Sequence, residues 1–248
     1  LTVGDLFVYQ AKVREPVRGS YRGMTVLTMP PPSSGGVCVL EILDLLERGG
    51  YESMRDEQRA HLLVEASRRA FADRARYFGD PDAVEVPVAD LLDPDYLQSR
   101  FLTISMTHAT PSSEVGPGLA PESKETCHFS VADGEGNAVA CTTTLNGAYG
   151  CGVAVSGVLL NNEMDDFTLL PGVPNQFGLL QGEANAIAPG RRPVSSMTPT
   201  ILLREGEVEL VLGSPGGPTI ISTVAQVLAN RYASGMSLEE SIRAPRLH

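Results

Sequence analysis

The alternation of apolar and polar positions is clearest between residues 56 and 78. Apolar side chains recur every three or four positions there, at Leu62, Leu63, Ala66, Ala70, Phe71 and Ala75. The opposite side of the pattern carries four arginines, Arg59, Arg68, Arg69 and Arg76. This periodicity predicts an amphipathic helix over Asp56–Phe78, ended by Gly79 and Pro81. His61 lies beside the apolar stripe, and we interpret it as a packed or solvent-facing histidine and not as a catalytic one.

Shorter patterns predict further helices and strands. The expected helices are Thr2–Ala11, Val37–Leu46, Asp93–Phe101, Pro218–Ala233 and Ser237–Ile242, the last with Ser237 as its N-cap and Glu240 three residues on. The expected strands are Tyr21–Thr28, Cys127–Val131, Ala138–Leu145, Gly157–Asn162, Ile201–Arg204 and Val208–Gly213. Helices and strands mixed in this way predict an α+β fold.

The hairpin of residues 127–145, with its turn at Asp133–Asn137, begins directly after Thr126. A threonine at the head of a buried strand is ordinary, because β-branched residues favour strands. A reactive threonine is the alternative interpretation. The segment Asp80–Ser123 leads up to it, with six prolines and one expected short helix, and loops of that length are usually functional or disordered.

Two other irregular segments have alternative interpretations. Met29–Gly36 reads MPPPSSGG, which is either a linker between domains or a structural loop near a site. The apolar helix that follows favours the loop, because its glycines then lie at a buried helix N-terminus. Thr168–Pro193 is rich in Gly, Pro, Asn and Gln, and is expected to be a long mobile loop that can cover a pocket.

Composition excludes several classes of protein. The 248 residues carry a net charge of −11 with a pI near 4.8, and no segment supplies the basic patch that nucleic acid requires. No apolar run approaches the roughly 20 residues of a membrane span. The cysteines, Cys38, Cys127, Cys141 and Cys151, show no metal-ligand spacing, so we expect four buried free thiols and no metal. The compartment is not assigned by these features.

Two clusters are candidates for chemistry. Glu163, Asp165 and Asp166 place three carboxylates within four residues, which is either a solvated acidic turn or a binding or acid/base site. GSPGG, residues 213–217, follows a strand and precedes a helix. Phosphate-binding motifs are absent there, so the amides of Gly216 and Gly217 fit an oxyanion hole better than a nucleotide site.

Six motifs in the same order resemble the γ-glutamyltransferase family: MPPPSSGG, TCHFSVADGEGNAVACTTTLN, SGVLLNNEMDDF, PVSSMTPT, GSPGG and APR. The resemblance implies an N-terminal nucleophile hydrolase fold, a four-layer αββα sandwich that this chain represents incompletely. It also implies a precursor that cuts itself between Glu125 and Thr126 into large and small subunits. Residues 1–125 then correspond to the end of the large subunit and 126–248 to most of the small subunit, within one structural domain.

The same resemblance implies residue roles. Thr126 becomes the nucleophile, its own α-amine serves as general base, and Thr144 steadies it. Asn146, Glu163 and Asp166 hold the α-amino group of a γ-glutamyl substrate, and Ser195 and Ser196 meet its carboxylate. Gly216 and Gly217 form the oxyanion hole. No cofactor is implied. An arginine expected early in the family's large subunit, where it clamps that carboxylate, has no counterpart in this sequence.

Three functions stay open at this point. The first is hydrolysis or transfer of γ-glutamyl amides, with water or an amino acid or peptide as acceptor and a heterodimer as the processed form. The second is a cephalosporin or glutaryl amidase of the same fold, against which the retained Asn146, Glu163 and Asp166 argue. The third is an uncleaved, inactive structural module.

Overall fold

A four-stranded antiparallel sheet lies at the centre of the computed structural model, which describes residues 2–115, 126–173, 175, 179 and 181–248. Its strands, in spatial order, are β1 (Val17–Tyr21), β2 (Met24–Thr28), β7 (Thr200–Arg204) and β8 (Glu207–Leu212). The pairing of β2 with β7 aligns Val26 with Leu202. Because these strands are far apart in sequence, the sheet joins the two ends of the chain into one core.

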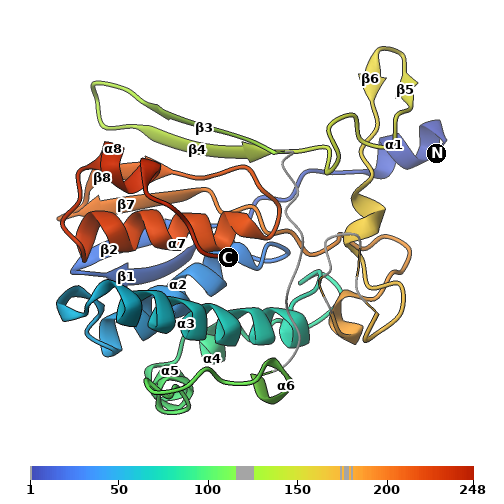
Figure 1. Ribbon diagram of the computed structural model, residues 1–248. Coiled ribbons are helices and arrows are strands. Elements are labelled where there is room, and N and C mark those ends of the chain that lie inside the picture. The colour runs from blue at the N-terminus through green and yellow to red at the C-terminus, as the bar shows by residue number, and fades with distance from the viewer. Residues whose placement is uncertain (1, 116–125, 174, 176–178, 180) are drawn as a thin grey trace.

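Helices cover one face of this sheet (Figure 1). They are α2 (Gly35–Arg48), α3 (Asp56–Tyr77) and α7 (Thr219–Tyr232). Helix α2 contacts β1, β2, α3 and α7, so it occupies the middle of the layer. Its apolar side chains and those of β2, α3, β7 and α7 form a single buried cluster, in which Ile42, Leu62 and Leu202 are fully buried. Burial of this cluster, at about 25 cal/mol per Å² of apolar surface, is the main source of stability.

The hairpin of β3 (Cys127–Ala132) and β4 (Ala138–Thr143) lies against the other face, where both strands contact β8 and β4 also contacts β7. The order is therefore helices, sheet, hairpin, which corresponds to three of the four expected layers. The described residues form no helical layer over the outer side of the hairpin. Phe129 and Val131 are 51% and 54% exposed there. The α+β class is confirmed, and the hairpin is an exposed one rather than the buried strand expected after Thr126.

Shorter elements complete the described chain. They are α1 (Val3–Val8), η1 (Tyr51–Ser53), α4 (Val88–Leu91), α5 (Pro94–Leu102), α6 (Ser112–Val115), β5 (Ala154–Val155), β6 (Val158–Leu159), η2 (Glu163–Asp166), η3 (Glu183–Asn185) and α8 (Leu238–Arg243). The capping box of Ser237 and Glu240 at α8 is confirmed. None of the described helices is both long and apolar enough to cross a membrane.

Three strand and helix predictions were wrong. Tyr21–Thr28 is not one strand, because Arg22 and Gly23, with φ of 52° and 76°, turn the chain between β1 and β2. Gly157–Asn162 forms only the two-residue β6, whose side chains are exposed because no core lies beside them. Asp80–Ser123 contains three short helices in its described part instead of one, although the helix expected over Asp93–Phe101 is confirmed as α5.

Two burial predictions were also wrong. Arg69 lies on the inner side of α3, 2% exposed, and its guanidinium pairs with Glu65 at 2.7 Å. The four cysteines are free, as expected, but Cys127 and Cys151 are exposed and only Cys38 is buried. The apolar residues next to these cysteines were therefore a poor guide to their burial in and after the hairpin. His61 is packed, as expected, with its Nε2 2.6 Å from the carbonyl oxygen of Ser105.

Candidate active site

Thr126 lies immediately before β3, and Thr144 immediately after β4, at the same open end of the hairpin. The Thr126 hydroxyl donates to Thr144 Oγ1 at 3.4 Å, and that oxygen also accepts the Asn146 backbone N–H at 2.9 Å. The hairpin register thus places a second hydroxyl beside the first. Glu125, the other side of the expected cleavage site, lies outside the described residues.

Asn146 is held in a conformation that few residues adopt. Its φ is 70°, in the left-handed region that asparagine tolerates better than most side chains. Its Nδ2 donates to the Asn162 carbonyl at 3.3 Å, and Asn162 Oδ1 accepts the Gly147 N–H at 2.7 Å. Asn162 therefore clips the segment after Thr144 to the acidic turn, and only 6% of Asn146 is exposed.

Glu163 and Asp166 lie at the two ends of η2, on the pocket side of the acidic turn. Burial first, then the hydrogen bond and the negative charge of Glu163, raise the pKa of Asp166 to about 8, against the opposite effect of Arg74. Burial also raises the pKa of Glu163. Two carboxyl groups this close share a proton when nothing positive is bound. The pair is accordingly suited to an ammonium ion, which stabilises both charges.

Ser195 and Ser196 precede β7 and are held by the proline-rich loop. Ser34 donates to the Ser195 carbonyl from both its backbone N–H and its hydroxyl, each at 2.9 Å. Ser195 N–H donates in turn to the Pro32 carbonyl at 3.1 Å. A Cβ on Gly35 would overlap the Thr198 hydroxyl, so only glycine permits this approach. MPPPSSGG is therefore a structural loop, as the sequence favoured, and its place near a functional site stays a prediction.

Gly216 and Gly217 connect β8 to α7, with φ of 126° and 53°. Their carbonyl oxygens accept the N–H groups of Thr219 and Ile220, each at 3.1 Å. Their own N–H groups make no hydrogen bond with any described residue. Free amides at the N-terminus of a 14-residue helix attract negative charge. This is the arrangement that an oxyanion hole requires.

These groups converge on one pocket. Its polar lining comes from Arg74, Thr126, Thr144, Asn146, Glu163, Asp166, Ser195, Ser196 and Gly217. Every residue assigned a role in the sequence therefore lines it, apart from Gly216, which is adjacent to Gly217, and the undescribed Glu125. The Thr126 hydroxyl, an acidic pair, two serines and a helix N-terminus face the same space. That set can hold a zwitterion and stabilise an oxyanion.

Sequence reasoning missed two buried residues of the site, Arg74 and Asn185. Asn185, 2% exposed, donates through Nδ2 to the Asp166 carbonyl at 2.7 Å and accepts the Val194 N–H at 3.0 Å. It thus joins the acidic turn to the serine segment, which no local pattern announces. Arg74 did leave a signal, because it lies four positions after Ala70, on the apolar stripe of its own helix.

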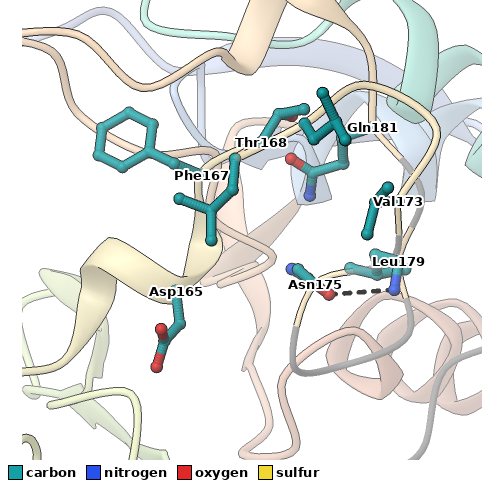
Figure 2. A pocket seen from close by; sticks show the side chains of 9 residues that line it. Asp165, Phe167, Thr168, Val173, Asn175, Leu179 and Gln181 are labelled. Carbon is teal, nitrogen blue, oxygen red and sulfur yellow. Dashed lines mark hydrogen bonds between the residues drawn. The ribbon is translucent and has the colours of Figure 1, made fainter.

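A second cavity of about 120 Å³ lies beside the pocket and shares Leu179 with it (Figure 2). Its other lining residues are Asp165, Phe167, Thr168, Leu169, Leu170, Val173, Asn175 and Gln181. Thr168 Oγ1 and Gln181 Nε2 are buried there without a hydrogen-bond partner among the described residues. The described part of the predicted loop over Thr168–Pro193 is mostly irregular and forms most of this cavity's wall.

Comparison with known proteins identifies the family to which the chain belongs. A family model described as Gamma-glutamyltranspeptidase matches residues 1–248. The chain belongs to this family. The "Glutathione hydrolase proenzyme" of Escherichia coli (strain K12) is 48% identical over 257 residues, covering 100% of this chain and 44% of the relative. The "Acylase ACY 1 proenzyme" of Pseudomonas sp. (strain SE83) is 40% identical over 250 residues, covering 98% of this chain and 42% of the relative.

A solved structure has the same architecture. The crystal structure of cephalosporin acylase from Bacillus halodurans matches 99% of this chain and 42% of that chain, with a TM-score of 0.78 and 25% identity. The N-terminal nucleophile hydrolase fold expected from the family resemblance is thereby confirmed. The chain spans less than half the length of each of these three relatives.

Proposed function

We propose that this γ-glutamyltranspeptidase-family chain contributes the nucleophile and most of the substrate pocket of an enzyme that hydrolyses or transfers γ-glutamyl groups. One observation supports the proposal best. The Thr126 hydroxyl faces a pocket lined by the Glu163–Asp166 pair as well as by Ser195 and Ser196. An α-amino acid carries an ammonium and a carboxylate on one carbon, and these two groups of residues complement them.

The proposal begins with self-cleavage. Thr126 Oγ1 attacks the carbonyl carbon of Glu125, its proton passes to the departing Thr126 nitrogen, and the amide becomes an ester. Water then hydrolyses that ester, which leaves a carboxylate on Glu125 and a free α-amine on Thr126. This amine has an ordinary pKa of about 7.7–8.0, so a fraction of it is unprotonated at slightly alkaline pH and can accept a proton from the neighbouring hydroxyl.

Turnover repeats the chemistry on a substrate. Thr126 Oγ1 attacks the γ-carbonyl, and the Gly216 and Gly217 amides stabilise the oxyanion that forms. The α-amine, protonated in that step, gives its proton to the leaving amine, and an ester on Thr126 remains. Water or an acceptor amine then releases the γ-glutamyl group. Loss of one oxyanion donor costs on the order of 3 kcal/mol in barrier height.

The competing candidate is a glutaryl or cephalosporin amidase, which the 40% identity to "Acylase ACY 1 proenzyme" keeps in view. Such a substrate lacks the α-amine. Leaving two half-buried carboxyl groups without a cation is unfavourable, because both must then share a proton or stay solvated. The acidic pair at Glu163 and Asp166 thus favours the γ-glutamyl substrate.

The test compares release of aniline dye from γ-glutamyl and glutaryl anilides by the purified protein. We expect the γ-glutamyl anilide to have a kcat/KM at least about a hundredfold higher, because two charge-assisted contacts are at stake. Asp166→Asn should remove most of that preference, whereas Glu183→Gln, at an exposed carboxylate of η3, should retain it. Equal rates on both anilides refute the assigned recognition. Thr126→Ala should abolish both activities, and no activity in the wild-type protein supports a non-catalytic module.

A further inference from the structure

Arg74 projects from α3 into the candidate active site while only 3% exposed. Its Nε donates to Ser34 Oγ at 2.9 Å, and its Nη2 donates to Ser196 Oγ at 3.2 Å. Nη1 has no hydrogen bond to any described residue. The guanidinium thus lies directly behind one of the two serines that meet the substrate carboxylate in the proposed function.

The surroundings of Arg74 differ from those of the other deeply buried arginine on α3. Arg69 is paired with the Glu65 carboxylate at 2.7 Å. Arg74 has only hydroxyl partners, and no described carboxylate lies within ion-pair distance of it. Burial lowers its pKa, while the negative charge of Asp166 acts in the opposite direction. A guanidinium stays charged even so, and a buried charge without a counterion is costly.

The acidic pair does not remove that cost. Asp166 already shares its hydrogen bond with Glu163, and its charge is reserved for a cation in the proposed function. Among the described residues, the pocket therefore contains the Arg74 guanidinium, which has no carboxylate partner, and the Glu163–Asp166 pair, which has no cation. A bound zwitterionic substrate supplies a partner for each, with its carboxylate towards Arg74 and its ammonium towards the acidic pair.

We propose that Arg74 is a positioning residue that supplies the positive charge opposite the α-carboxylate of the γ-glutamyl substrate, acting through Ser196. Ser196 Oγ accepts the Arg74 hydrogen bond, which leaves its own hydrogen to donate to the carboxylate. The guanidinium strengthens that donor and neutralises the anion behind it. Arg74 is distinct from the early large-subunit arginine implied by the family resemblance, since it belongs to this chain. The inference rests on the proposed function.

The test uses three anilides: γ-glutamyl, 4-aminobutyryl, which lacks the α-carboxylate, and glutaryl, which lacks the α-amine. Arg74→Gln should lower kcat/KM for the γ-glutamyl anilide by about ten- to a hundredfold, mainly through KM, as expected for the loss of a charged hydrogen-bond partner. The 4-aminobutyryl anilide should lose less than about twofold, because it has no group for Arg74 to neutralise. The kcat/KM for glutaryl anilide should fall by about as much as that for the γ-glutamyl anilide, because both substrates carry the carboxylate.

Two other patterns overturn the proposal. Equal losses on all three substrates indicate that Arg74 only maintains the fold. Losses that follow the α-amine, on γ-glutamyl and 4-aminobutyryl alone, indicate that it acts on Asp166. Arg76→Gln, on an exposed face of the same helix, is the matched control and should change none of the three rates.

Folding is checked separately through self-cleavage before Thr126. If Arg74→Gln fails this check, Arg74→Lys is used instead. Lysine keeps the positive charge, but its single ammonium group cannot donate to both Ser34 and Ser196 as the planar guanidinium does. It should lose several-fold on the γ-glutamyl anilide and remain unchanged on 4-aminobutyryl anilide; an equal loss on both overturns the proposal. Failure of the proposed function is distinguishable, since the wild-type protein then prefers glutaryl anilide or cleaves none of the three.

Discussion

Helix α2 and the outer face of the β3–β4 hairpin carry similar apolar side chains in opposite surroundings. Val39 and Ile42 of α2 are fully buried, whereas Phe129 and Val139 of the hairpin are 51% and 54% exposed. Helix α2 is therefore held by apolar packing. The described contacts of the hairpin lie on its inner face, where the Ser130 hydroxyl donates to the Val211 carbonyl at 3.2 Å.

This difference divides the candidate active site into two parts. Ser195, Ser196 and the glycines before α7 are attached to the packed core. Thr126 belongs to the hairpin, and Asn146, Glu163 and Asp166 follow it on segments joined mainly by side-chain clips such as Asn162 and Asn185. Substitutions in the core should consequently affect stability most, and substitutions among the clips should affect activity most.

The largest effect expected from this comparison is at Ile42. Ile42→Ala should lower the free energy of unfolding by about 2–5 kcal/mol, because it removes packing and leaves a cavity in the fully buried layer. Activity per folded molecule should change little. Denaturant unfolding and active-site titration measure the two quantities. Phe129→Ala, at an exposed position, is the control; a comparable loss there would show that the hairpin face is covered in solution.

Asn185 tests the clips. Asn185→Ala should lower kcat/KM on γ-glutamyl anilide about tenfold or more, because Asp166 and Val194 lose their shared partner, while stability falls by only about 1–2 kcal/mol. Asn185→Asp keeps the acceptor for Val194 N–H and loses the donor to Asp166, so its KM should rise more than its kcat falls. A loss of stability larger than that of Ile42→Ala would contradict the claim that Asn185 affects activity more than stability.

The acidic pair gives a pH dependence with a defined sign. Because the Asp166 pKa is raised to about 8, its carboxyl group is protonated below that pH and ionised above it. KM for γ-glutamyl anilide should therefore fall as pH rises from 6 towards 8, by up to about tenfold per pH unit. KM for glutaryl anilide should not show this fall. The same trend in Asp166→Asn would assign the titration to another group.

Thr168 gives the smallest effect. Its hydroxyl is buried beside the second cavity without a partner among the described residues. Thr168→Val should raise the free energy of unfolding by up to about 1 kcal/mol. Valine has nearly the same shape as threonine but replaces the unsatisfied hydroxyl with a methyl group. Thermal unfolding followed by circular dichroism measures the change. A clear loss of stability would instead show that the hydroxyl is hydrogen-bonded in solution.

Periodicity predicted the packed region well and the clipped region poorly, for a physical reason. The helix over residues 56–77 and the helix over 219–232 each turn one apolar face to the core. That face is visible in the sequence as apolar residues that recur every three or four positions. The two-residue β6 follows an apolar run that has nothing to pack on, so the same rule overestimated it. Local pattern reports burial only where a core exists.

The site residues were found in a different way. Thr126, Glu163 and Ser195 came from ordered family motifs, and the fold brings them to one pocket although they are far apart in sequence. Asn185 and Arg74 were missed, because their roles depend on contacts between the loop, α3 and the serine segment. Only the three-dimensional arrangement supplies those contacts. The roles assigned to all these residues stay predictions until the substitutions are measured.

The most direct measurement is the N-terminal sequence of the purified protein after incubation at neutral pH. The account predicts a new chain that begins Thr-Cys-His-Phe, because Thr126 becomes a terminus and its α-amine becomes the base. The Thr126→Ala protein should give no such sequence. A wild-type protein that turns over γ-glutamyl anilide while residues 125 and 126 stay joined would contradict the account, since Thr126 would then have no free amine.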